Sequence, residues 1–127
     1  MINIIGLIVG GSLGTLLRYG VFCLFSNASI LFPWATIIIN TSGSFSIGFL
    51  YGIFNYFTVS PVVKSSIFLG VLGAFTTFSA YSLECLQLFN DGRYKVGILY
   101  IVLINLLSLL AVWLGFSLFK FFFNFSK

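Results

Sequence analysis

Charged residues are so sparse in this chain that they divide it into long apolar segments. No Lys, Arg, Asp or Glu occurs between Arg18 and Lys64. Nineteen uncharged residues separate Lys64 from Glu84, and twenty-four separate Lys95 from Lys120. A membrane-spanning helix needs about 20 mostly apolar residues. The pattern therefore predicts four transmembrane helices, near residues 2–25, 32–57, 61–89 and 96–123.

Short polar turns at residues 26–30, 58–60 and 90–94 join these segments and leave no room for a soluble domain. We therefore expect residues 1–127 to form a single four-helix transmembrane domain. The first segment is not expected to be a cleaved signal peptide. No cationic leader precedes it, and it continues into glycine-rich sequence that carries an arginine.

Composition excludes several classes of protein. Of 127 residues, 60% are hydrophobic and 6% are charged, whereas soluble domains carry roughly a quarter charged residues. The formal charge is +4, but the basic residues are spread over the helix ends, so nucleic acid is not an expected partner. Histidine is absent and no acid–base pair stands out, which argues against an enzyme. Cys23 and Cys85 lack metal or disulfide spacing and are interpreted as small buried hydrophobes.

The basic residues also bear on membrane orientation. An even number of spans places both termini on one side, together with Lys64, Lys120 and Lys127. The other side carries Arg18, Arg93 and Lys95. Because a Lys/Arg imbalance orients membrane proteins, a tally of three against three favours insertion in both orientations and an antiparallel dimer. A single, weakly biased orientation remains the alternative.

Small residues recur at intervals of four in two segments, namely Gly6, Gly10 and Gly14, and then Ser44, Gly48 and Gly52. This spacing lets helix backbones approach closely, and we interpret it as helix packing. Arg18 is different, because an arginine inside an apolar span is costly unless it reaches the interface, pairs or faces water. It either reaches the interface or forms a cationic vestibule that attracts an anion.

Polar residues also occur within the second and fourth segments. Asn40, Thr41, Ser42 and Ser44 form one cluster, and Asn105 and Ser108 form another. Polar groups in hydrocarbon need partners, so these side chains are expected to point into the bundle. They either hold helices together or line a pathway.

The third segment carries the densest signal. Gly70 and Gly73 are followed by Thr76 and Thr77, a combination that predicts a break in the third helix. At that depth, irregular backbone must be buried in protein or line a cavity, where its freed carbonyls can coordinate a cation. Phe78 and Tyr81 follow, one turn apart and flanked by hydroxyls. Ring edges and hydroxyls together can solvate a small anion, although aromatic residues at this spacing also occur in ordinary cores. Glu84 lies at the end of this segment, where an acidic residue more often marks a helix end at the membrane interface than a functional site.

These residues resemble a known family. The sequence GGSLGTLLRY, which starts at Gly10, resembles the GGxxGxxxRY signature that opens the Fluc (CrcB-type) fluoride channels. Residues 33–48 are similar to their PxGTxxxN…GSFxxG segment, and residues 70–84 resemble their GxxGGxTTFSTFSxE core. Each motif is weak alone, but three in the same order and at the same spacing make a specific match.

The resemblance implies an all-α membrane protein that assembles as an antiparallel, dual-topology homodimer. It implies two fluoride pores and a buried structural sodium ion. Such a channel is embedded in membrane lipid. It exports fluoride passively across the bacterial cytoplasmic membrane and so relieves fluoride toxicity. The balance of basic residues agrees with this assembly independently.

Site residues follow from the resemblance position by position. The fluoride pore is expected to contain Asn40, Phe78, Ser79, Tyr81 and Ser108. Arg18 matches the vestibule arginine and Glu84 the acidic residue at the pore mouth. Gly73 and Thr76 match the positions whose backbone carbonyls hold sodium.

Two positions depart from the family pattern. Tyr81 stands where phenylalanine is usual, which keeps the ring edge and adds a phenol, and Ala35 stands where glycine is usual. Two other functions fit the sequence less well. A small dual-topology multidrug exporter needs a carboxylate in its first span, and this chain has none there. A structural membrane subunit would not need the break that is predicted in the third helix. Pairing with a second, different copy also remains open.

Overall fold

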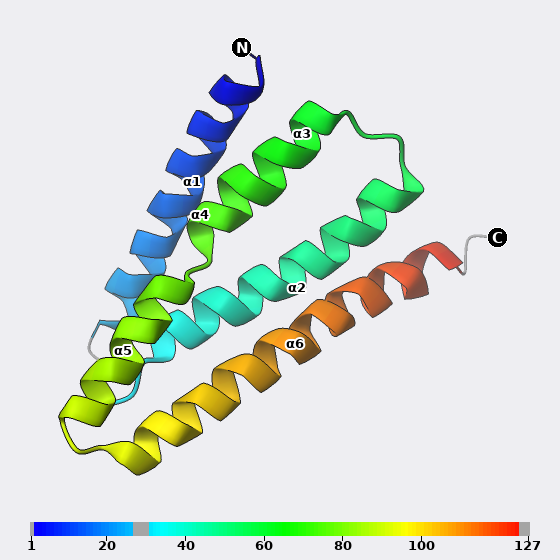
Figure 1. Cartoon of the computed structure of the whole chain (residues 1–127). Coiled ribbons are helices and arrows are strands. Elements are labelled where there is room, and N and C mark those ends of the chain that lie inside the picture. The colour runs from blue at the N-terminus through cyan, green and yellow to red at the C-terminus, as the bar shows by residue number, and fades with distance from the viewer. Residues whose placement is uncertain (1, 27–30, 125–127) are drawn as a thin grey trace.

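The computed structural model describes residues 2–26 and 31–124. Of the expected turn at residues 26–30, only Ser26 is therefore described, and Lys127 lies outside the described residues. The described residues form helices and contain no strand. The helices are α1 (Ile2–Phe25), α2 (Trp34–Tyr56), α3 (Pro61–Ser65), the π-helical η2 (Ser66–Leu72), α4 (Gly73–Phe75), α5 (Phe78–Asn90) and α6 (Tyr94–Asn124) (Figure 1).

Four helical stretches are long and apolar enough to cross a membrane. They are Ile4–Phe25, Trp34–Tyr56, Pro61–Asn90 and Tyr94–Phe123. The third stretch contains α3, η2, α4 and α5 in succession. The protein is therefore an all-helical, multi-pass membrane protein, as the spacing of charges predicts.

Local sequence explains two of the turns. The Ser60 hydroxyl accepts a hydrogen bond from the Val63 N–H at 3.3 Å and caps α3. Pro61 occupies the first turn of that helix, where its missing N–H costs nothing. Between α5 and α6, Gly92 has a φ of 71°, a left-handed conformation that glycine adopts without steric cost. Both turns reverse the chain at a membrane surface.

The helices form two pairs that diverge from one end of the molecule (Figure 1). α2 packs along α6, and α1 packs along η2 and α4. The α5–α6 turn lies at the end of the molecule opposite the start of α1 and the end of α6. Arg93 and Lys95 therefore lie at one end, and Lys64 and Lys120 lie at the other.

Glycines allow close contact within each pair. A Cβ atom on Gly14 would lie 2.1 Å from the Val71 carbonyl oxygen, and one on Gly48 would lie 2.0 Å from the Val112 carbonyl oxygen. No side chain fits at such distances, so the helix backbones touch. The predicted packing role is confirmed for Gly6, Gly10, Gly14, Gly48 and Gly52.

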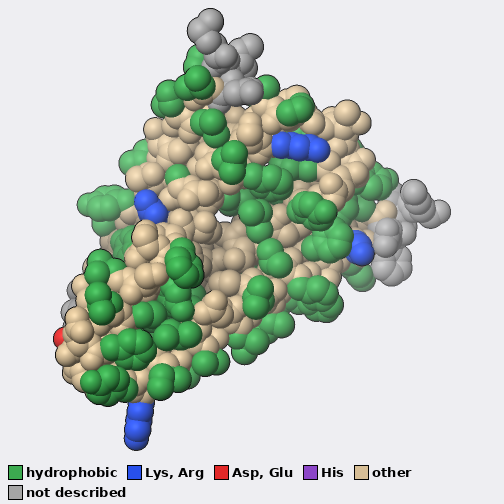
Figure 2. Space-filling model, viewed as in Figure 1, with side chains coloured by type: hydrophobic (Ala, Val, Ile, Leu, Met, Phe, Trp, Pro, Cys, Tyr) green, Lys and Arg blue, Asp and Glu red, His purple; other side chains and the backbone are tan. Residues whose placement is uncertain are grey.

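Hydrophobic side chains cover much of the outer surface (Figure 2). Among the described residues few large side chains are fully buried, and Tyr100, Ile39 and Thr36 are the largest of them. This arrangement suits a protein whose outer face is solvated by lipid tails. Cys85 is buried as expected, but the same prediction was wrong for Cys23, which is exposed. Cys23 lies near the C-terminal end of α1.

Candidate functional site

The third stretch changes conformation where α4 ends. Thr76 has φ and ψ of −76° and 156°, and Thr77 has −151° and 120°, so both residues are extended. The Thr76 hydroxyl and N–H donate to the Leu72 carbonyl at 2.8 and 2.9 Å and close α4. The Thr77 hydroxyl accepts from the Ala80 N–H at 3.2 Å and caps α5, as threonine commonly does.

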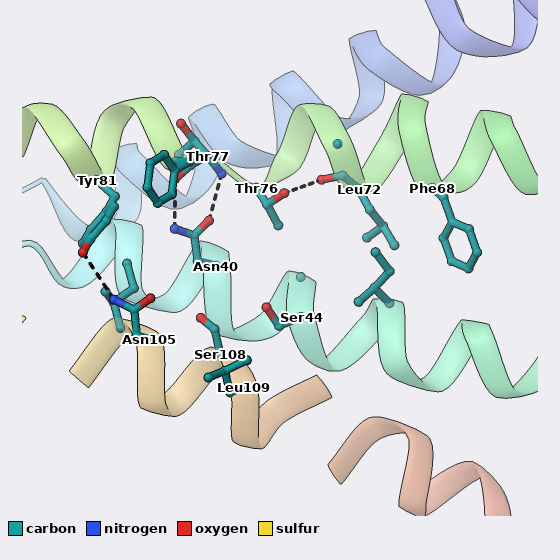
Figure 3. Close-up of a pocket in the computed structure, with 15 residues that line it drawn as sticks. Asn40, Ser44, Phe68, Leu72, Thr76, Thr77, Tyr81, Asn105, Ser108 and Leu109 are labelled. Atoms are coloured by element: carbon teal, nitrogen blue, oxygen red, sulfur yellow. Dashed lines mark hydrogen bonds between the residues drawn. The ribbon is translucent and has the colours of Figure 1, made fainter. Parts of the chain in front are cut away.

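Asn40, on α2, holds the extended Thr77 with both ends of its amide (Figure 3). Its Nδ2 donates to the Thr77 carbonyl at 3.0 Å, and its Oδ1 accepts from the Thr77 N–H at 2.8 Å. Buried backbone groups need partners, and within a bilayer water does not supply them. One side chain therefore supplies both hydrogen bonds that the lost helical conformation no longer provides.

These contacts take the usual donors away from two backbone carbonyls. In a continuous α-helix the Gly73 carbonyl accepts from the N–H of Thr77, and the Thr76 carbonyl accepts from the N–H of Ala80. Here the Thr77 N–H donates to Asn40 and the Ala80 N–H donates to the Thr77 hydroxyl. Gly73 and Thr76 are the two residues expected to offer carbonyls to sodium. Carbonyls released from helical bonding are suitable ligands for that ion.

Gly73 and Thr76 line a cavity of about 380 Å³ between α2, α6 and the third stretch (Figure 3). Four of the five residues expected in the pore also line it, namely Asn40, Phe78, Tyr81 and Ser108. Residues from three separate helical stretches thus converge on one space. Ser79 is the expected pore residue that does not line it.

Two aromatic rings lie on the α5 side of this cavity. The centroids of Phe78 and Tyr81 are 5.2 Å apart, with 56° between the ring planes. The Tyr81 ring also lies 5.5 Å from that of Tyr100. Phe78 is 76% exposed in the single chain, so its ring is not part of this chain's own core. The alternative of ordinary core packing therefore does not hold for Phe78 within the single chain.

Ser108 contributes a buried hydroxyl that has no hydrogen-bond partner within the described part of the chain. The large majority of buried polar side-chain atoms in proteins are hydrogen-bonded, so an exception needs an explanation. Because Ser108 lines the cavity, a ligand within the cavity is one suitable partner. Thr41 also has an unpaired buried hydroxyl, but it is not among the residues that line this space.

Arg18 and Ser79 lie together in a separate groove of about 330 Å³ between α1 and α5. The Ser79 and Thr77 hydroxyls are 3.2 Å apart and share a hydrogen bond. Thr77 lines both the groove and the cavity, so it lies between them. Consecutive residues on a helix point in different directions, which explains why Ser79 leaves the face that its neighbour Phe78 occupies.

Glu84 lies in a third space of about 220 Å³, near the α5–α6 turn, with Asp91 and Arg93. Its carboxylate accepts hydrogen bonds from the Thr36 hydroxyl at 2.7 Å and the Tyr100 hydroxyl at 2.5 Å. Glu84 thus connects α5 to α2 and α6 and does more than end a helix. Thr36 and Tyr100 could not be predicted as its partners, because no spacing in the sequence links them to Glu84.

Taken together, the fold and site define a small four-span membrane protein with a polar and aromatic cavity beside released backbone carbonyls. Carbonyls, hydroxyls and ring edges inside a membrane are typical of ion pathways. Residues 5–116 match the family model described as CrcB-like protein, Camphor Resistance (CrcB). The chain belongs to this family.

Similar proteins cover nearly the whole chain. A protein of Parabacteroides distasonis is 37% identical over 121 residues, which cover 94% of this chain and 94% of the relative. A protein of Rhizobium meliloti is 42% identical over 113 residues, 87% of this chain and 90% of the relative. One from Saccharophagus degradans is 41% identical over 105 residues, 82% and 79% of the two chains. All three are named fluoride-specific ion channel FluC.

Proposed function

We propose that this protein is a fluoride-selective ion channel, and not an enzyme, that exports fluoride passively across the bacterial cytoplasmic membrane. The observation that carries the proposal is the convergence of Asn40, Phe78, Tyr81 and Ser108 on one cavity. The relatives named as fluoride-specific channels support the same function.

The cavity has the chemistry that a small anion needs. Fluoride is strongly hydrated, so a selective pore must replace its water with fixed partners. The positive edges of Phe78 and Tyr81 and the unpaired hydroxyl of Ser108 supply such partners. Asn40 has a supporting role here, because its amide is already bonded to Thr77. Arg18 and Ser79 in the groove, and Glu84 near the turn, form the approaches to the pore.

The channel is proposed to be an antiparallel homodimer with two pores. Ser79, Ser82 and Asn105 lie within membrane-capable stretches yet are exposed in the single chain. Polar side chains inside a bilayer face protein or water and seldom face lipid. A partner subunit that covers them accounts for their exposure. An antiparallel arrangement agrees with the balanced count of Lys and Arg.

A structural sodium ion is proposed at the carbonyls of Gly73 and Thr76. The extended residues Thr76 and Thr77 are then the functional break in the third membrane helix. The Thr76 hydroxyl is turned back onto the Leu72 carbonyl, which leaves the backbone oxygen as the ligand that this residue offers. Sodium bound there would hold the break rigid, while Asn40 holds it from the side of α2.

The decisive experiment is anion efflux from liposomes that contain the purified protein. Liposomes are loaded with either potassium fluoride or potassium chloride, valinomycin balances the charge, and ion-selective electrodes follow release. We expect rapid fluoride release and little chloride release. Equal release of both anions, or of neither, would contradict the proposed selectivity.

The assembly has its own test. Reporters fused to the C-terminus are expected on both sides of the membrane in comparable amounts. Three lysines added after Lys127 should force one orientation and abolish fluoride export. A copy biased in the opposite direction should restore export when it is coexpressed. A single orientation of the unmodified protein would rule out the antiparallel assembly and leave the conduction assay unaffected.

A further inference from the structure

Tyr81, on α5, and Asn105, on α6, meet at the wall of the cavity (Figure 3). Asn105 Nδ2 lies 3.3 Å from the Tyr81 hydroxyl oxygen. The same nitrogen lies 2.7 Å from the Ile101 carbonyl oxygen. This pair depends on the hydroxyl that distinguishes Tyr81 from the phenylalanine usual at its position.

The contact with Ile101 fixes the direction of the second hydrogen bond. A backbone carbonyl only accepts, so the NH₂ end of the Asn105 amide must face it. The second hydrogen of that NH₂ group is then directed to Tyr81, whose oxygen is the acceptor. Both donor hydrogens of Asn105 are thereby used. The Tyr81 hydroxyl keeps its own proton.

That proton has no strong acceptor within the described part of the chain. The Cys85 thiol lies one turn further along α5, but sulfur is a weak acceptor. A hydroxyl that accepts a hydrogen bond also becomes a better donor, because hydrogen bonds in a chain polarise one another. Tyr81 therefore presents a polarised O–H group at the wall of the cavity.

We propose that the Tyr81 hydroxyl is a hydrogen-bond donor to the permeating anion, and that Asn105 is the residue that positions it. This inference rests on the proposed function and adds a binding group to it. A phenylalanine at this position offers an anion only the edge of its ring. This chain offers a ring edge together with an oriented O–H donor.

Such a donor raises affinity most for small anions that accept strong hydrogen bonds. Hydrogen bonds to charged groups are among the strongest in proteins. Fluoride is therefore expected to gain more from the Tyr81 hydroxyl than chloride does. The measurable consequence is the fluoride concentration at which efflux reaches half its maximal rate.

The test compares fluoride efflux from liposomes over graded internal fluoride concentrations. Tyr81→Phe should still conduct fluoride, with a half-saturating concentration about tenfold higher, as expected for the loss of one hydrogen bond to an ion. Asn105→Leu keeps the side-chain size and should produce part of the same shift. Tyr51→Phe is the matched control, because Tyr51 is exposed on α2 and does not line the cavity. It should leave the half-saturating concentration unchanged.

The double variant separates positioning from packing. If Asn105 acts through the Tyr81 hydroxyl, Asn105→Leu should add no further shift to Tyr81→Phe. A full additional shift would overturn the positioning role. Unmodified protein that conducts fluoride, combined with a Tyr81→Phe variant within twofold of it, would overturn this inference alone. Unmodified protein that conducts no fluoride would overturn the proposed function as well.

Discussion

Glycine brings the helices together in both pairs, but only one pair changes conformation along its length. α2 and α6 are continuous helices, and Gly48 and Gly115 each lie against a carbonyl of the opposite helix. α1 uses Gly10 and Gly14 in the same way against η2 and α4. Beyond that contact, the partner of α1 becomes extended at Thr76 and Thr77. The continuous pair provides the frame, and the other pair provides the extended residues Thr76 and Thr77.

The comparison also shows that glycines within one pair of helices have different roles. At Gly14 an added Cβ atom would lie 2.1 Å from a carbonyl oxygen. At Gly73 the nearest atom would be the Phe68 carbonyl oxygen at 3.4 Å, and the residue is exposed. Gly14 is thus required for contact within the chain, whereas Gly73→Ala should allow the single chain to fold. The importance of Gly73 is expected to lie in the proposed cation site.

The largest expected effect is on the frame. Gly48→Leu forces a side chain into the Val112 backbone. A helical backbone cannot move aside as a flexible side chain can. The cost should exceed the roughly 1–3 kcal/mol of an ordinary overpacked site, and folded protein should be lost. Gly11→Leu is the matched control, because a Cβ atom there meets nothing within 4 Å. The two variants are compared by yield and by gel-filtration profile in detergent. A normal profile for Gly48→Leu would contradict the close contact between α2 and α6.

The next effect is on conduction without loss of the frame. Phe78→Ile keeps an apolar side chain but removes the ring edge that is proposed to solvate fluoride. Fluoride efflux from liposomes should fall by about two orders of magnitude or more, equivalent to roughly 3 kcal/mol. The gel-filtration profile should stay unchanged.

Phe122→Ile, near the exposed end of α6, is the control for loss of a phenylalanine and should conduct normally. A collapsed gel-filtration profile for Phe78→Ile would show that the ring packs at a subunit interface. Unchanged efflux would show that fluoride does not pass this face.

A smaller effect is expected where the two pairs meet. Asn40→Asp keeps the acceptor for the Thr77 N–H but replaces the donor to the Thr77 carbonyl with a second oxygen. Loss of that bond should cost about 1–3 kcal/mol and lower the thermal midpoint in detergent. Asn55→Asp, on the exposed end of the same helix, should leave the midpoint nearly unchanged. Equal midpoints for both variants would mean that Asn40 does not hold the extended segment.

The smallest effect is expected at the Thr76 side chain. Thr76→Val removes the hydroxyl bond to the Leu72 carbonyl, a local contact worth about 1 kcal/mol or less. Thr76→Ser should behave like the unmodified protein. If sodium is held by the backbone carbonyl, all three proteins should be stabilised by sodium chloride relative to N-methylglucamine chloride. Loss of sodium stabilisation in Thr76→Val alone would assign the ligand to the side chain instead.

The amino-acid sequence was enough to predict the membrane class, the four stretches and the packing role of five glycines. Uncharged runs, such as the twenty-four residues between Lys95 and Lys120, depend only on local composition. The motif around Thr76 and Thr77 can also be recognised in the sequence, because its glycines and threonines are close together in the chain. Resemblance to a family then identified six of the fifteen residues that line the cavity.

Tertiary structure decided which distant polar groups meet. Asn40 binds Thr77, which lies 37 residues away, and Glu84 binds Thr36, which lies 48 residues away. It also directed Asn105 to Tyr81. These pairs depend on how helices cross and rotate about their axes, and close packing over many residues sets that geometry. Hydropathy and local spacing describe one helix at a time and carry no such information.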